Sequence, residues 1–243
     1  MDVFGTQGAL RLKMPLGVNV APDGTVLVAD GGLRRVVAFT PDGSVERVYG
    51  AEGDLVNPTD AIVSPDGHRV LVSDSRSHAI VMFDRKTGSK LLTLGKKGTG
   101  EGEFSAPTSL ALDAEGNLYV VDQLNSRVQI LTGDGEYLDE IGGLGVGYGN
   151  LARPKDVVVD DNGLIYVTDF AFNNVQLFDA DLSLLTFIGD AGPGPGQFRG
   201  ASGVAVHGNE FAVVDQLGAR VQVFRFIATA GKEGSDTPSI SRR

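Results

Sequence analysis

The feature that most constrains this chain is a motif that recurs five times along it. Each copy opens with a short apolar run that starts at Pro15, Pro58, Pro107, Pro154 or Ala201, at spacings of 43, 49, 47 and 47 residues. A second apolar run follows and ends in an aspartate, at Asp30, Asp74, Asp122, Asp169 or Asp215. Five copies in one register predict five equivalent structural units.

Each copy has the pattern of short strands joined by tight turns. The runs are rich in Val, Ile, Leu, Phe and Tyr, and pairs such as Asp23-Gly24 and Asn162-Gly163 separate them. Such pairs supply the positive φ that two-residue hairpins require. A four-stranded unit of about 40–50 residues cannot bury both of its faces alone, so it packs against its neighbours. The sequence therefore predicts an all-β fold, a β-propeller of four-stranded antiparallel blades with five repeats visible.

The fifth copy has no recognisable fourth strand, because Phe224 continues into an Arg-Phe-Ile run without a turn. The N-terminal residues 3–5 (Val-Phe-Gly) match the ends of the other fourth strands, so we expect them to complete the last blade and close the ring. The propeller would then span residues 1–231, and the polar tail 232–243 is expected to be disordered. The alternative is a six-bladed parent whose first blade lies upstream of Met1.

These residues resemble the NHL-repeat β-propellers. Residues 125–130 (Asn-Ser-Arg-Val-Gln-Ile), 101–104 (Glu-Gly-Glu-Phe) and 193–198 (Pro-Gly-Pro-Gly-Gln-Phe) are close to that family's repeat consensus. The resemblance covers nearly the whole chain and is greatest to bacterial six-bladed NHL-repeat proteins of unassigned function, which are often exported or membrane-anchored. Five visible copies depart from that number.

Composition restricts the partners. With 21 Lys+Arg against 31 Asp+Glu among 243 residues, the net charge is −10, which argues against nucleic-acid binding because that affinity depends on basic residues. No stretch approaches the roughly 18 apolar residues of a membrane helix, and the chain has no Cys. The N-terminus lacks a secretion signal. We expect a monomer that is cytoplasmic as written, or periplasmic or membrane-anchored if N-terminal sequence is missing.

The recurrent charged residues are expected to be structural, because a single active site needs its groups once and not in every blade. Each aspartate is predicted to accept backbone N–H bonds in the loop after the second strand. Three copies carry an arginine five residues later, and we expect these to bridge neighbouring blades: Arg35, Arg127 and Arg220.

Partner-binding residues are expected on the loops between second and third strands, which lie with the inter-blade loops around the mouth of a propeller's channel. Phe170 and Phe172 stand where other copies hold polar or small residues, and exposed aromatics are favoured binding anchors. The alternative is that they pack on a neighbouring loop. The polar rim near them would comprise Asn173, Gln123, Asn125, Gln216, Arg34, Arg76 and His78.

The starts of the inner strands carry the candidate metal ligands. Asp60 and Asp156 occupy the second position after the proline, where their carboxylates could hold Ca²⁺. The other interpretation is that they cap strands or pair with Lys155 and Arg153. No other cofactor is indicated.

The histidines argue against a zinc enzyme. His68 and His207 fall in hairpins on the face opposite His78, whereas a catalytic zinc site typically takes three protein ligands. We therefore predict a non-catalytic scaffold that binds a protein or peptide. The alternative function is a metal-dependent propeller hydrolase or lyase, similar to the lactonases or the amidating lyases.

Overall fold

The computed structural model of the chain describes residues 11–145, 147–227 and 239–242. Its contacts divide the chain into two compact units, Met1–Ile141 and Gly142–Arg243. Among the described residues, no helix is long and apolar enough to cross a membrane.

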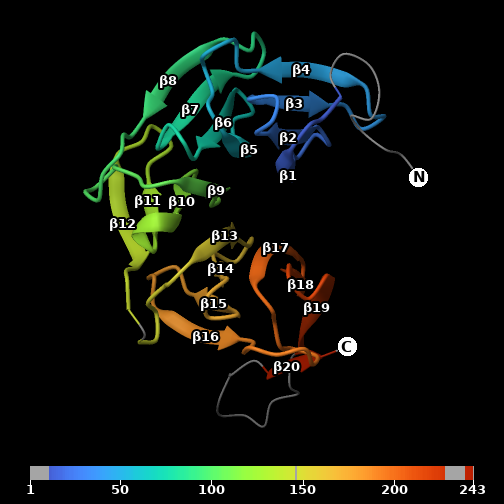
Figure 1. The fold of residues 1–243 in the computed structure, drawn as a ribbon, viewed down its shortest axis with the longest axis vertical. Coiled ribbons are helices and arrows are strands. Elements are labelled where there is room, and N and C mark those ends of the chain that lie inside the picture. The colour runs from blue at the N-terminus through green and yellow to red at the C-terminus, as the bar shows by residue number, and fades with distance from the viewer. Residues whose placement is uncertain (1–10, 146, 228–238, 243) are drawn as a thin grey trace. The chain divides into compact units, whose positions relative to one another are not determined.

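The first unit contains three four-stranded antiparallel sheets, each a propeller blade whose strands pair in chain order (Figure 1). The first blade is β1 (Pro15–Val20), β2 (Val26–Asp30), β3 (Arg35–Phe39) and β4 (Val45–Tyr49). The second is β5 (Pro58–Val63), β6 (Arg69–Asp74), β7 (Ala79–Asp84) and β8 (Lys90–Leu94). The third is β9 (Pro107–Leu112), β10 (Leu118–Asp122), β11 (Arg127–Leu131) and β12 (Tyr137–Gly142), with a short 3-10 helix η1 (Gln123–Asn125) between β10 and β11.

The second unit contains two blades of the same kind. The fourth blade is β13 (Pro154–Val159), β14 (Ile165–Asp169), β15 (Asn174–Phe178) and β16 (Leu184–Ile188). The fifth is β17 (Ala201–His207), β18 (Glu210–Asp215), β19 (Arg220–Ile227) and β20 (Ser239–Arg242). The predicted fold class, an all-β propeller of four-stranded blades, is confirmed.

The fourth strand of the fifth blade corrects the sequence-based expectation. It is β20, which pairs antiparallel with β19 between Phe224 and Ile227, so residues 239–242 of the predicted tail 232–243 form a strand. β19 runs eight residues, longer than the other third strands, and its extension offers backbone N–H and C=O groups that β20 pairs. Residues 3–5, expected to fill this position, lie outside the described residues.

Apolar side chains between successive blades form the cores. In the first unit, Leu27 and Val36 of the first blade pack with Val72 and Phe83 of the second. In the second unit, Tyr166 of the fourth blade packs on Phe211 of the fifth, with ring centroids 5.5 Å apart. Burying a side chain of this size stabilises the fold by about 1.5–3 kcal/mol, so packing between blades holds each sheet in place.

The turn after the second strand has the same shape in every blade. The residue four positions after the recurrent aspartate has a left-handed backbone with φ between 51° and 57°: Arg34, His78, Ser126, Asn173 and Ala219. Because non-glycine residues rarely adopt this conformation, its recurrence indicates that the flanking hydrogen bonds determine the turn.

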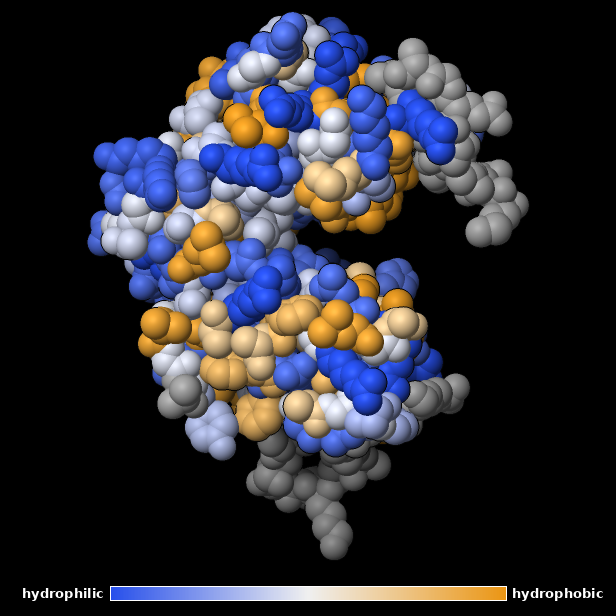
Figure 2. Space-filling model, in the orientation of Figure 1, coloured by the Kyte–Doolittle hydropathy of each residue, from blue (hydrophilic) through white to orange (hydrophobic). Residues whose placement is uncertain are grey.

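The first and last blades each present an apolar face to solvent. On β1, Val18 is 66% exposed, whereas Ala61 at the same position of the second blade is 1% exposed. On β19, Val221 is 60% exposed, whereas Val36 and Val175 at that position are fully buried. Hydrophobic surface is visible beside β1 in Figure 2. The blade-packing pattern therefore continues onto two exposed faces.

Candidate functional site

The five recurrent aspartates are fully buried and bond to the loop backbone. The carboxylate of Asp30 accepts the N–H groups of Lys13 (2.6 Å), Met14 (3.0 Å) and Leu33 (2.9 Å). Asp74, Asp122, Asp169 and Asp215 accept equivalent N–H groups from the loop before their own blade. Each aspartate thereby ties the inter-blade loop to the second strand, and four of them also cap the following turn. The predicted capping role is confirmed, and both kinds of loop lie together at one end of each blade.

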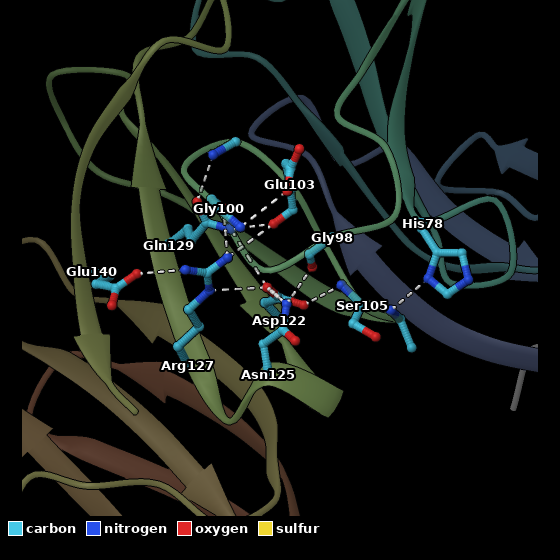
Figure 3. Close-up of polar contacts among 12 residues, drawn as sticks. His78, Gly98, Gly100, Glu103, Ser105, Asp122, Asn125, Arg127, Gln129 and Glu140 are labelled. Atoms are coloured by element: carbon cyan, nitrogen blue, oxygen red, sulfur yellow. Dashed lines mark hydrogen bonds and ion pairs between the residues drawn. The ribbon is translucent and has the colours of Figure 1, made fainter. Parts of the chain in front are cut away.

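Two of the three recurrent arginines clamp the loop that precedes their blade. Arg127 donates from Nε to Asp122 (3.1 Å) and from Nη2 to the carbonyls of Gly100 (2.8 Å) and Glu103 (3.0 Å). Its Nη1 donates to Glu140 on the outer strand (2.8 Å; Figure 3). Burial raises the pKa of Asp122, and the N–H of Ser105 and the neighbouring Arg127 oppose that rise.

The fifth blade repeats this clamp. Arg220 donates to Asp215 and to the carbonyls of Gly194 and Gln197. Arg127 and Arg220 were expected to bridge neighbouring blades, but each bonds its own blade to the loop that precedes it. A guanidinium has enough N–H donors to bond a carboxylate and two carbonyls at once. Arg35 is exposed and forms no such clamp among the described residues.

The clamped loop also requires glycine where it leaves the outer strand. Gly95 follows β8 with φ +80°, and an added Cβ would lie 2.5 Å from the ring of Phe104. Phe104 is fully buried. Glycine there permits both the turn and the close approach of the ring.

The fourth blade departs from this arrangement. Asn174 occupies the arginine position, and its Oδ1 is buried with no hydrogen-bond partner in the described part of the chain. Phe187 occupies the position of Glu140 and stacks on Tyr148 with ring centroids 5.7 Å apart. Gln176 Nε2 still donates to the carbonyl of Asn150 (2.8 Å). Among the described residues, the loop before this blade therefore lacks the guanidinium bonds that hold the equivalent loops of the third and fifth blades.

Phe170, predicted to contact a partner, lies in a cluster of cations. The guanidinium carbon of Arg153 is 5.0 Å from the ring centroid and the Lys155 Nζ is 5.8 Å from it. The ring also packs against Gly200, where an added Cβ would collide with it. Burial, and then the charge of Arg153, lower the pKa of Lys155. We call Arg153, Lys155 and Phe170 the Phe170 cluster.

Several predicted rim residues use their side chains within the fold. His78 Nδ1 accepts the N–H of Ala106 (3.1 Å), and Asn173 Oδ1 accepts the N–H of Gly200 (2.8 Å). Ala106 and Gly200 both directly precede an inner strand, so the two side chains have one structural role. Asn125 Nδ2 donates to the carbonyl of Gly98 (2.8 Å).

The remaining predicted residues divide between the units. Phe172 is half-buried and Gln216 exposed in the second unit, and in the first unit Gln123 is half-buried while Arg34 and Arg76 are exposed. Whether these side chains contact a partner stays a prediction.

The two candidate metal ligands lie in different units and bond to the inner strands. Asp60 accepts Asn19 Nδ2 (2.8 Å) and the N–H of Leu110 (2.9 Å), so it links three successive blades. Asp156 accepts the N–H of Val204 (2.8 Å) in the next blade. The part of the chain that the structure describes holds no group of three His, Cys, Asp or Glu placed to bind a metal. Sequence reasoning missed this linking role, although both carboxylates stand at the same repeat position.

Comparisons with known proteins agree with this architecture. A family described as 6-bladed beta-propeller matches residues 112–188. The E3 ubiquitin-protein ligase TRIM71 of Rattus norvegicus is 32% identical over 130 residues, which are 47% of this chain and 15% of that protein. This chain spans between 4% and 32% of the length of the curated relatives that it matches.

Two solved structures share the fold. Virginiamycin B lyase from Staphylococcus aureus aligns with a TM-score of 0.69 at 16% identity, over 99% of this chain and 72% of that one. A protein of unknown function from Bacteroides thetaiotaomicron aligns with a TM-score of 0.65 at 19% identity, over 86% of this chain and 54% of that one. Identity this low shows similarity of fold alone.

Proposed function

We propose that this chain, an NHL-repeat-like β-propeller, is a non-catalytic scaffold that binds an acidic segment of a protein or peptide through the loops after its second strands. The observation that carries the proposal is the Phe170 cluster, in which Arg153 and Lys155 both lie over one aromatic ring. Aromatic and arginine side chains dominate the binding energy of protein interfaces.

The backbone around the cluster is fixed before any partner arrives. Asp169 accepts the N–H groups of Ala152 and Arg153 from one side and those of Ala171 and Phe172 from the other. One fully buried carboxylate thus holds both segments that carry the cluster. A preorganised surface loses less conformational entropy on binding, so more of its contact energy appears as affinity.

Charge supports an acidic partner. The chain carries a net charge of −10, yet Arg153 is exposed at this end of the blade and forms no ion pair among the described residues. Carboxylates of a partner would meet the guanidinium while apolar groups cover the ring. Guanidinium groups bind carboxylates through two parallel hydrogen bonds, which gives orientation as well as affinity.

The test uses a fluorescein-labelled, glutamate-rich peptide with one central Phe and measures binding by fluorescence anisotropy. We expect Arg153→Glu and Phe170→Ala each to weaken binding at least tenfold, which corresponds to about 1.4 kcal/mol. Lys90→Glu is the matched control, because it makes the same change of charge on an exposed residue of β8. No binding to the wild type, or equal losses for Arg153→Glu and Lys90→Glu, would reject the proposal.

The alternative, a metal-dependent hydrolase or lyase, predicts a bound metal. Elemental analysis of the purified protein tests it, and a stoichiometric metal that dialysis does not remove would favour it over the scaffold.

A further inference from the structure

The outer edge of the fourth blade has an apolar surface with an aromatic stack. Tyr148 is 83% exposed, Leu185 57% and Phe187 43%. We call these three residues the blade-four rim. From their placement on and beside the edge strand β16, we infer that this edge binds an extended peptide segment by adding it as a further strand, at a surface separate from the Phe170 cluster.

β16 presents a backbone edge that the described sheet does not pair. The strand order is β13-β14-β15-β16, so β16 has β15 on one side only. Its ladder with β15 is regular from Thr186 to Ile188 and shifts at Leu184. Free N–H and C=O groups along such an edge are a template for another strand, which fixes the occupant as an extended chain.

β16 lacks the charges that protect the outer strands of the first unit. β4 contains Glu46 and Arg47, β8 contains Lys90, and β12 contains Asp139 and Glu140. The sequence of β16 is Leu-Leu-Thr-Phe-Ile. Charged side chains on an edge oppose pairing with another chain, so their absence leaves β16 open to it.

The fourth blade differs from the third at the two positions that form the ion pair. In the third blade the carboxylate of Glu140 accepts a hydrogen bond from Arg127 Nη1. In the fourth blade those positions are Phe187 and Asn174, and Phe187 stacks on Tyr148 at an interplanar angle of 21°. Where the third blade has an ion pair, the fourth blade therefore has an exposed aromatic stack beside a strand edge.

The size of the edge favours a peptide over a second copy of the chain. β16 has five residues, a length of about 17 Å. One edge of this length is small compared with the surface of about 800 Å² that each partner of a stable protein pair buries. Strand addition of a short peptide needs less, because main-chain bonds give affinity and alternate side chains give specificity. Leu185 and Phe187, two residues apart, would contact alternate apolar side chains of that peptide.

The test uses a labelled synthetic peptide that alternates Thr and Val, with one Lys and one Glu at its ends so that its net charge is zero. We expect saturable binding to the wild type by anisotropy, slower hydrogen exchange of residues 184–188, and at least tenfold weaker binding to Leu185→Lys. A peptide with a central Pro, which lacks one main-chain donor, should not bind.

Leu138→Lys is the matched control, since Leu138 is a 48% exposed leucine at the equivalent position of β12. Leu138→Lys should change binding of the Thr/Val peptide less than twofold. Arg153→Glu should leave binding of this peptide unchanged, which distinguishes the β16 edge from the site of the proposed function. Equal binding to Leu185→Lys and wild type, no binding to the wild type, or protection outside β16 would overturn the inference. Sedimentation showing a dimer that Leu185→Lys disrupts would assign the edge to a second copy instead.

Discussion

The loops that precede the third and fourth blades have related sequences but are held differently. The third-blade loop, residues 98–104, is clamped by Arg127, whose side chain is 9% exposed and bonds to Asp122, Glu140 and two carbonyls. In the fourth blade Asn174 stands at the arginine position, and among the described residues its Oδ1 has no hydrogen-bond partner. The buried aspartate and its backbone bonds persist in both blades.

The comparison of the two loops shows that the aspartate is present in every blade, whereas the arginine is not. Every blade keeps the aspartate, because several backbone N–H groups would otherwise be buried without a partner. The arginine is replaceable, because the fourth blade retains Gln176 on the same loop. In the fourth blade, where Asn174 replaces the arginine, Phe187 stands at the position of Glu140 and stacks on Tyr148.

The largest effect is expected from Arg127→Ala. Removing the arginine leaves Asp122 buried without a cation and takes one donor from each of the carbonyls of Gly100 and Glu103, so we expect a loss of about 3 kcal/mol in the free energy of unfolding. Urea denaturation measures it. Arg220→Ala should cost less, about 1–2 kcal/mol, because the Arg220 side chain is 33% exposed. Equal losses at the two sites would contradict the dependence on burial.

A smaller gain is expected from rebuilding the clamp in the fourth blade. Asn174→Arg combined with Phe187→Glu reproduces the Arg127–Glu140 pair, and we expect about 1 kcal/mol of stabilisation. Hydrogen exchange of residues 147–151 should slow in the double variant. The Phe187→Glu variant alone is the control and should be destabilised or neutral. An unchanged exchange rate in the double variant would show that the loop has no place for the guanidinium.

The Phe170 cluster should respond to pH. Burial lowers the pKa of Lys155 below 10.5, so this side chain loses its positive charge at a lower pH than an exposed lysine. Binding of the glutamate-rich peptide should therefore be strongest below the lowered pKa and weaken as the pH rises through it. Lys155→Arg should remove this weakening, because arginine stays charged. An identical pH profile for the two proteins would exclude Lys155 from the site.

The smallest effect is expected from Asn173→Gly. The substitution removes the cap on the Gly200 N–H but relieves a positive φ of 56°, and these two contributions oppose each other. The free energy of unfolding should change by less than about 1 kcal/mol in thermal or urea unfolding. Asn173→Ala, which loses the cap and keeps the strain, should be the less stable of the two.

Sequence periodicity predicted the blades and the capping aspartates, because both depend on residues that recur in every copy. The bonds of Asp60 and Asp156 to the next blade were not predictable, since carboxylates at strand starts are equally compatible with a cation. β20 was also missed, because the Ser-Ile-Ser-Arg segment lies in a polar tail without the apolar pattern of the other strands. The position of Arg153 over Phe170 depends on how two loops meet, which spacing alone does not reveal.

Hydrogen exchange with and without the glutamate-rich peptide tests the central claim most directly. If the chain is a scaffold that binds through the loops after its second strands, the peptide should slow exchange at residues 152–156 and 170–173, where Asp169 holds both segments together. Arg153→Glu should abolish that protection. Peptide binding that leaves these two segments unprotected, or protection that persists in Arg153→Glu, would contradict the account.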